Sequence, residues 1–353
     1  MSENHLIEDA DLFNKFELQF FTIFFPLFHQ TRKPNSFFPV FFWVLLIIQL
    51  ISLALFRIDN STQSQSALSE VVNYIDLSSL SLMVGKYSIF LVAGFLNLLI
   101  IFFILLMICA YFFRHIVETQ PWFITFVRVL HDVLLRVLSI PIASVCITMF
   151  DCYNIIETNE AGEEIKISVW RAANDNICMG SLYQVVGTVL AAFTFTIVVV
   201  YCCTIDLLIY NHNPKNGGLF SCPDGLFNFI QRMFILSLVF ILRYIYPWEF
   251  WRGVASIGDS IILIVYIIYK QPYYTLKSNF MAQIPWIIFG SVRLCAEIGY
   301  ALERRFYSVI PQIILLLIST VITIILSYGV FLLTKSRMKK LWMLSNDEKP
   351  LFK

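Results

Sequence analysis

The residues best able to carry chemistry in this sequence are charged side chains that interrupt long apolar stretches. Four of them fall in the last third of the chain: Arg243, Asp259, Arg293 and Glu297. A charge inside a membrane span is costly, so it is usually paired or functional. Arg293 and Glu297 are four residues apart and share a helix face, which lets them form an ion pair. The group predicts a neutral ion-pair network that holds helices together, which we favour, or a polar cavity that binds a small solute or ion.

A second polar group lies near the other ends of the apolar stretches. It comprises His131, Asp132 and Arg136 at the start of one stretch, Asp206 at the end of the next, and Arg232 at the start of the one after. Asp132 precedes Arg136 by four residues, which is the favourable order for a helical ion pair. We expect a helix face in contact with water at the membrane surface; the alternative is a proton relay through His131.

Two cysteines stand apart from the others because they bracket one acidic polar segment. Cys152 and Cys178 lie close to the two helix ends that this segment joins. Neighbouring helices pack about 8–10 Å apart, and disulfide-linked Cα atoms are usually about 4.4–6.8 Å apart, so residues near those ends can meet. We expect a disulfide between them; the alternative is two unrelated thiols. The sequon at Asn60 is the candidate glycosylation site.

Sequence patterns of enzymes and metal sites are missing. Ser256-Ile257-Gly258-Asp259 lacks the first glycine of the Gly-x-Gly-Asp pattern of intramembrane aspartyl proteases. The sequence contains no His-Glu-x-x-His, Gly-x-Ser-x-Gly or phosphate-binding loop pattern, and no Cys/His spacing typical of zinc. We therefore expect no catalytic residues, no metal and no cofactor.

The composition places these residues in a membrane protein. Of 353 residues, 58% are hydrophobic and 14% are charged, with 25 Lys and Arg against 24 Asp and Glu. Soluble domains carry about 25% charged residues, and the mean hydropathy of +0.75 agrees with a membrane location. These values exclude a soluble enzyme, a nucleic-acid-binding protein with a basic face and a disordered chain. The expected partner is the lipid bilayer and not a nucleic acid.

The apolar stretches predict an all-α, polytopic transmembrane bundle of about eight spans. A helix needs about 20 mostly apolar residues to cross the bilayer core, and barrel strands would alternate apolar and polar residues, which these stretches do not. The spans are expected near residues 37–56, 87–113, 129–150, 182–205, 226–246, 254–269, 280–302 and 306–334.

The two tails and the loops predict the orientation of the bundle. Residues 1–33 contain a Phe-rich amphipathic helix expected to lie at the headgroup level, and residues 335–353 form a basic tail that anchors the last span. An even number of spans puts both termini on one side, and the excess of Lys and Arg in the loops and termini of that side favours the cytosol. The sequon and the acidic segment 151–181 then fall on the other side, which fits the secretory pathway or the plasma membrane.

A series of short motifs follows the order and spacing of a known family. The landmarks are Leu138-Ser139-Ile140-Pro141, Phe150-Asp151-Cys152, Cys178, Asn211-His212-Asn213-Pro214 with the loop through Asp224, and Tyr269-Lys270-Gln271-Pro272-Tyr273-Tyr274 with Asn279. This order resembles the N-terminal membrane region of the tiny macrocysts (TmcB-like) proteins of ciliates and amoebozoans. The resemblance covers roughly residues 15–335 and is carried by residues 128–300.

The resemblance implies a role in sensing or signalling. Family members continue past the membrane region into a long cytosolic part, whereas this sequence ends at Lys353, and it has Thr275 where the family usually has Asn. We therefore expect a non-catalytic sensor or scaffold component that is a short relative or a piece of a longer protein. The alternative is a channel or transporter for a small solute or ion that uses the polar residues Arg243, Asp259, Arg293 and Glu297.

Overall fold

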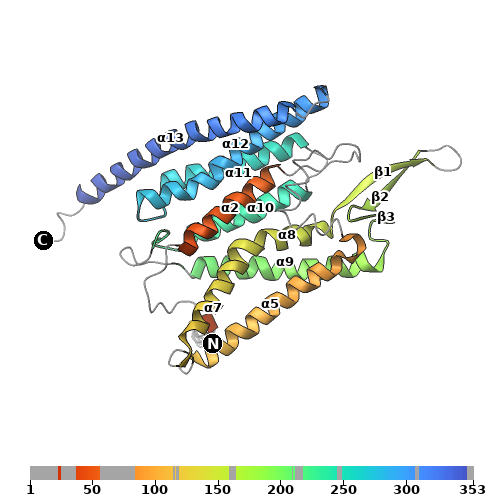
Figure 1. The fold of residues 1–353 in the computed structure, drawn as a ribbon, viewed down its shortest axis with the longest axis horizontal. Helices are drawn as coiled ribbons and strands as arrows, with labels where there is room; N and C mark the ends of the chain where they lie inside the picture. Colours follow the sequence, from red (N-terminus) through yellow and green to blue (C-terminus); the bar gives the residue numbers. More distant parts are fainter. Residues whose placement is uncertain are drawn as a thin grey trace, which may run out of the picture.

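The structure is a computed structural model that places long helices side by side, with a small β-sheet at one end (Figure 1). It describes residues 23–24, 37–55, 84–113, 116, 119–158, 164–208, 210, 218–244, 249–306 and 310–347. Within these ranges, six helices are long and apolar enough to cross a membrane: Phe37–Leu55, Gly85–Tyr111, Leu182–Leu208, Phe250–Lys270, Leu276–Gly299 and Ile314–Met343. The chain is therefore a helical, multi-pass membrane protein, as its apolar stretches predict.

The described helical elements follow one another along the chain. They are α2 (Phe37–Leu55), η1 (Gly85–Tyr87), α5 (Ser88–Tyr111), α7 (Pro121–Asp132), η2 (Val133–Leu138), α8 (Ser139–Thr148), α9 (Leu182–Leu208), α10 (Leu226–Tyr244), α11 (Glu249–Lys270), α12 (Leu276–Phe306) and α13 (Ile310–Asp347). Two shorter apolar helices, Ser139–Thr148 and Leu226–Leu242, lie where the third and fifth spans are expected. The number of eight spans and the cytosolic placement of the termini stay predictions.

Helices α7, η2 and α8 form one continuous rod, because the residues at both junctions keep right-handed helical dihedrals. The middle part, η2, is a π-helix. All ten residues of α8 are buried. In Figure 1, α8 lies between α9 on one side and α2 with α10 on the other.

The buried apolar side chains form two clusters that meet at α8. Ile142 and Cys146 of α8 belong to a cluster with residues of α5, α7 and α9. Ile140 and Ala143 belong to a cluster with residues of α2, α10, α11 and α12. Because adjacent residues of α8 point into different clusters, this helix joins the two halves of the bundle.

Helix α13 lies along α12 at the opposite edge of the bundle from α5 (Figure 1). Only 6% of its apolar window is buried. Its contacts with α12 include the hydroxyl groups of Ser291 and Thr323 and the rings of Phe280 and Phe331. The helix also continues through the basic residues 335–340, so this part of the predicted tail is helical.

The segment between α8 and α9 is a three-stranded antiparallel sheet and not the polar loop that was predicted. It consists of β1 (Cys152–Thr158), β2 (Glu164–Trp170) and β3 (Ala173–Ile177), in the order β1-β2-β3. Tyr153 pairs with Val169 and Ile155 pairs with Ile167. These cross-strand pairs stabilise a sheet, and the alternation of apolar residues in β2 is the signal that predicts a strand.

Some predicted features lie outside the described residues. They are the sequon at Asn60 and nearly all of the N-terminal amphipathic helix, of which the structure describes Ile23 and Phe24.

The residue directly before α10, Gly225, lies in close contact with the end of α9. A Cβ atom at this position would lie 2.2 Å from the carbonyl oxygen of Leu207 and 2.6 Å from that of Asp206. Both oxygens belong to the backbone at the end of α9, so they cannot rotate away as a side chain would. A larger residue here has to push α9 and α10 apart.

We therefore expect Gly225→Ala to lower the free energy of unfolding by about 3 kcal/mol, as overpacking does. Thermal unfolding of the purified protein in detergent measures the change. Gly94→Ala is the matched control, because a Cβ at Gly94 meets no atom within 4 Å, and it should leave stability equal or slightly higher. Equal stability of both variants would contradict the close packing of α9 against α10.

Candidate functional site

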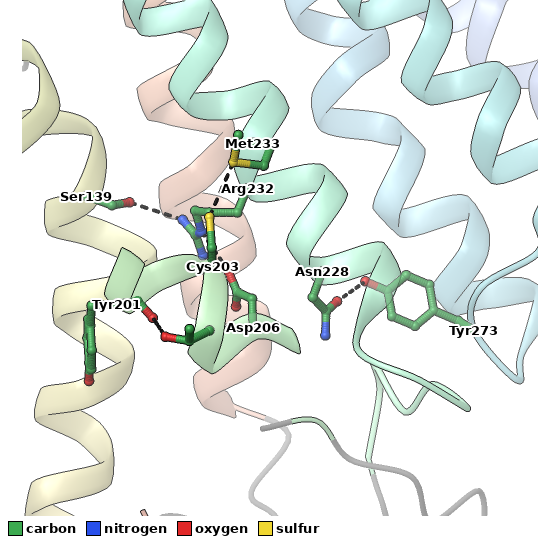
Figure 2. A network of polar contacts seen from close by, with 9 residues as sticks. Ser139, Tyr201, Cys203, Asp206, Asn228, Arg232, Met233 and Tyr273 are labelled. Carbon is green, nitrogen blue, oxygen red and sulfur yellow. Dashed lines mark hydrogen bonds and ion pairs between the residues drawn. The ribbon is translucent and has the colours of Figure 1, made fainter. Parts of the chain in front are cut away.

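A buried arginine joins three helices at the α10 side of the bundle (Figure 2). Arg232 of α10 is 8% exposed. Its Nε donates to Asp206 Oδ2 of α9 at 2.9 Å, and its Nη1 donates to Ser139 Oγ, the first residue of α8, at 3.1 Å. A buried guanidinium is tolerated when it is paired and hydrogen-bonded. The structure thus brings together the predicted residues Asp206 and Arg232 and adds Ser139, which the sequence analysis did not single out as polar.

The π-helix η2 ends one residue before Ser139. A π-helix shifts the backbone hydrogen bonds out of the α-helical pattern and is frequent at functional sites. Gln49 Nε2 of α2 donates to the carbonyl oxygen of Val137, in η2, at 2.6 Å. Helix α2 therefore contacts the rod next to the point where Arg232 contacts it, and α2, α8, α9 and α10 are tied together in one region.

The predicted residue His131 lies deeper than expected. It is 6% exposed, and its Nδ1 lies 2.6 Å from the hydroxyl group of Tyr201 of α9. The rings of Phe102 and Phe103 of α5 pack against Tyr201. The expectation of a water-exposed helix face is therefore wrong for His131, because α5 and α9 cover it. Asp132 is half-buried, and Arg136 belongs to η2, with its side chain outside the described part of the chain.

The residues of the other predicted group, Arg293 and Glu297 on one side and Asp259 on the other, make separate contacts. Arg293 of α12 is fully buried, pairs with Glu297 and donates from Nη1 to the carbonyl oxygen of Ala54 near the end of α2 at 3.1 Å. This contact satisfies one of the carbonyl groups that a helix end leaves without a partner. Glu297 also lies against α11, because a Cβ at Gly253 would be 3.0 Å from its Cδ.

Asp259 contacts a different helix. Its Oδ2 accepts a hydrogen bond from Ser237 Oγ of α10 at 3.2 Å. Among the described residues, no Lys, Arg or His forms an ion pair with Asp259. The side chain of Arg243 lies outside the described part of the chain. The four predicted residues therefore do not form a single described network.

The predicted disulfide is present at the start of the sheet. Cys152 and Cys178 are linked, with their Cα atoms 5.9 Å apart. The buried side chain of Gln184, in the first turn of α9, lies beside it: Nε2 is 3.4 Å from Cys152 Sγ, and Oε1 accepts from the amide of Met179 at 2.6 Å. The disulfide and Gln184 together fix the sheet to the end of α9.

A tryptophan and an ion pair fix the same sheet to the end of α8. Trp170 of β2 is fully buried, and its Nε1 donates to the carbonyl oxygen of Thr148 at 3.1 Å. Arg171 Nε lies 2.6 Å from Asp151 Oδ2, and its guanidinium lies 4.7 Å from the centre of the Tyr153 ring. These contacts were not predicted from the sequence. The sheet is thus attached to α8 and α9 without a free linker.

Two of the short sequence motifs meet at the end of the bundle opposite the sheet. The amide of Tyr274 donates to the carbonyl oxygen of Ser221 at 3.3 Å, and Ser278 Oγ donates to that of Leu219. Asn279 accepts from the amide of Tyr273 at 3.0 Å and donates to its carbonyl oxygen at 2.6 Å. The loop before α10 and the turn before α12 therefore form one hydrogen-bonded unit.

Thr275 caps the N-terminus of α12. Thr275 Oγ1 accepts from the amide of Ser278 at 3.1 Å, directly before α12 begins at Leu276. Thr and Asn both serve as helix N-caps, so either residue can begin this helix. Tyr273 completes the unit, because its hydroxyl group donates to Asn228 Oδ1 of α10 at 3.4 Å (Figure 2).

The described residues contain no group of three or more His, Cys, Asp or Glu side chains that could hold a metal ion. No family model, curated protein or solved structure matches this chain.

We expect the Arg232 contact to be strongly coupled, because the side chains of Arg232 and Asp206 are only 9% and 14% exposed. Arg232→Met or Asp206→Asn alone removes one partner of a buried charge and should cost about 3–5 kcal/mol of unfolding free energy. The double variant should cost less than the sum of the single variants by about 1–3 kcal/mol. Denaturant unfolding of the four proteins measures this coupling.

Lys86→Met is the matched control for this cycle, because Lys86 is exposed. It should change stability by no more than about 0.5 kcal/mol. Strictly additive effects of Arg232→Met and Asp206→Asn would contradict a direct interaction between the two side chains.

Proposed function

We propose that this chain acts as a non-catalytic membrane sensor or scaffold component of the kind that its resemblance to TmcB-like proteins implies. The observation that carries the proposal is the folded, disulfide-linked sheet joined directly to α8 and α9. The absence of a catalytic pattern from the sequence supports leaving catalysis out of the proposal.

The contacts of α8 support a mechanical route through the bundle. Trp170 donates a hydrogen bond to Thr148, the last residue of α8, and Arg232 donates one to Ser139, its first residue. Every residue between them is buried. A close-packed element moves between discrete arrangements and does not deform continuously, so a displacement of the sheet reaches Arg232 as a shift of the whole helix.

The same route ends near the hydrogen-bonded unit formed by the loop before α10 and the turn before α12. Arg232 belongs to α10, which begins directly after the loop that contacts Tyr274 and Ser278. We place the sheet on the non-cytosolic side and this loop unit in the cytosol, with the protein in the secretory pathway or the plasma membrane. The acidic segment, the sequon at Asn60 and the basic tail support this orientation.

We expect reduction of the disulfide to change the structure at both ends of the bundle. Hydrogen exchange should become faster in residues 152–178 and, through α8 and Arg232, also in residues 218–225 and 271–279. Exchange measured by mass spectrometry on the protein in lipid nanodiscs, with and without reductant, tests this expectation.

The matched control is the double variant Cys152→Ser/Cys178→Ser, which should show both changes without reductant and no further change with it. Faster exchange confined to residues 152–178 would show that the sheet moves independently of the bundle, and the transmission route would be wrong.

A channel or transporter for a small solute or ion is the second candidate, and Asp259 favours it. This carboxylate lies within α11, a helix able to span the membrane, and its described partner is the hydroxyl group of Ser237. An ionisable residue inside a membrane span commonly marks a solute or ion pathway.

The two candidates differ in a flux assay. Liposomes that contain a transporter should release or take up the solute, and Asp259→Asn should reduce the flux at least about tenfold, the range seen when a charged group of a site is lost. Glu164→Gln, a carboxylate change in the sheet, is the control and should leave the flux unchanged. A sensor or scaffold component should show no flux above that of protein-free liposomes for any of a panel of small ions and solutes.

A further inference from the structure

Basic side chains from three helices gather at the end of the bundle that lies opposite the sheet. Lys270 is the last residue of α11, Lys277 is the second residue of α12, and α13 carries the others at the same end. We call this group the basic end; it comprises Lys270, Lys277, Lys335, Arg337, Lys339 and Lys340. All of these side chains are exposed except that of Arg337, which is half-buried.

Arg337 fixes the position of this part of α13. Its guanidinium lies 4.7 Å from the centre of the Tyr269 ring, and its Nε donates to the carbonyl oxygen of Tyr269 at 3.5 Å. One turn earlier, Thr334 Oγ1 donates to Gln283 Oε1 of α12 at 3.1 Å. The basic residues of α13 are therefore held beside the ends of α11 and α12 and do not swing freely.

The charge of the basic end is not balanced by the protein segments that form it. Residues 260–296 and 306–346, which include all six of these cations, contain no Asp or Glu. Two buried arginines differ in this respect, because Arg232 pairs with Asp206 and Arg293 pairs with Glu297. The two segments that carry these cations therefore supply no counter-charge of their own.

The apolar residues around the basic end show what lies next to it. Leu332 and Leu333 precede the basic residues of α13, and Trp342 and Met343 follow them; all four are 46–69% exposed. Exposed apolar side chains on a membrane helix face lipid, and Trp is typical of the interface between acyl chains and water. The cations thus lie where the lipid-facing surface of α13 reaches the headgroups.

We propose that the basic end binds the headgroups of anionic glycerophospholipids of the phosphatidylserine class in the adjacent leaflet. Lysine and arginine clusters at the end of a membrane helix attract anionic lipids. Here three helices supply the cations, and Arg337 is held in place by Tyr269, so the site is more than a flexible basic tail. The inference does not depend on whether the protein is a sensor, a scaffold or a transporter.

Quenching of Trp342 fluorescence tests the proposal on the full chain in liposomes. Brominated phosphatidylserine in phosphatidylcholine should quench Trp342 more than brominated phosphatidylcholine at the same mole fraction. The signal of Trp342 is the difference between the wild type and Trp342→Phe. In the triple variant Lys335→Gln/Lys339→Gln/Lys340→Gln, the preference for phosphatidylserine should fall at least about fivefold.

The control variant is Lys86→Gln/Lys166→Gln, which removes two exposed lysines near the sheet and should keep the full preference. A second measurement uses the wild type alone, where high salt should weaken the preference because it screens exposed charges. Equal quenching by the two lipids, a preference that is insensitive to salt, or a triple variant that quenches like the wild type would overturn the proposal. Equal quenching would instead favour an acidic protein segment as the partner of the basic end.

Discussion

The burial of Arg232 sets the conditions that the surrounding helices have to meet. In a bilayer, helices gain little from hiding apolar side chains from one another, because lipid is equally apolar. Polar contacts and close backbone approach therefore decide which helices pack together. Arg232 requires a carboxylate and a hydroxyl group, and α9 and α8 supply them through Asp206 and Ser139. The close approach of Gly225 to the backbone at the end of α9 keeps α9 and α10 near enough for that contact.

The same rule explains why the sheet is so firmly attached. Helix α8 has no exposed face, so only its two ends can make contacts with elements outside the core. Trp170 donates a hydrogen bond to the carbonyl group of Thr148 at one end, and the Arg232 guanidinium donates one to Ser139 at the other. Each contact gives a hydrogen bond to a buried side-chain donor, the indole of Trp170 or the guanidinium of Arg232, and a buried donor without a partner is costly in a medium of low polarity.

Local patterns in the sequence predicted the features that depend on near neighbours. The apolar stretches predicted the long helices, the spacing of Arg293 and Glu297 predicted their ion pair, and the position of Cys152 and Cys178 beside helix ends predicted the disulfide. The contacts of Ser139 and Trp170 could not be predicted in this way, because each joins elements whose relative position the sequence does not state. The sheet was missed because its apolar alternation is short and is mixed with acidic residues. The burial of His131 was not predicted because residues of other helices, α5 and α9, cover its side chain.

The shallow attachment of α13 has a consequence for the biogenesis of the bundle. Neither described core cluster contains a buried residue of α13, and 6% of its apolar window is buried. Helices in a membrane are stable individually before they associate. Both cores can therefore close while α13 is still a separate helix in the lipid, so its docking along α12 is separable from the closing of the cores.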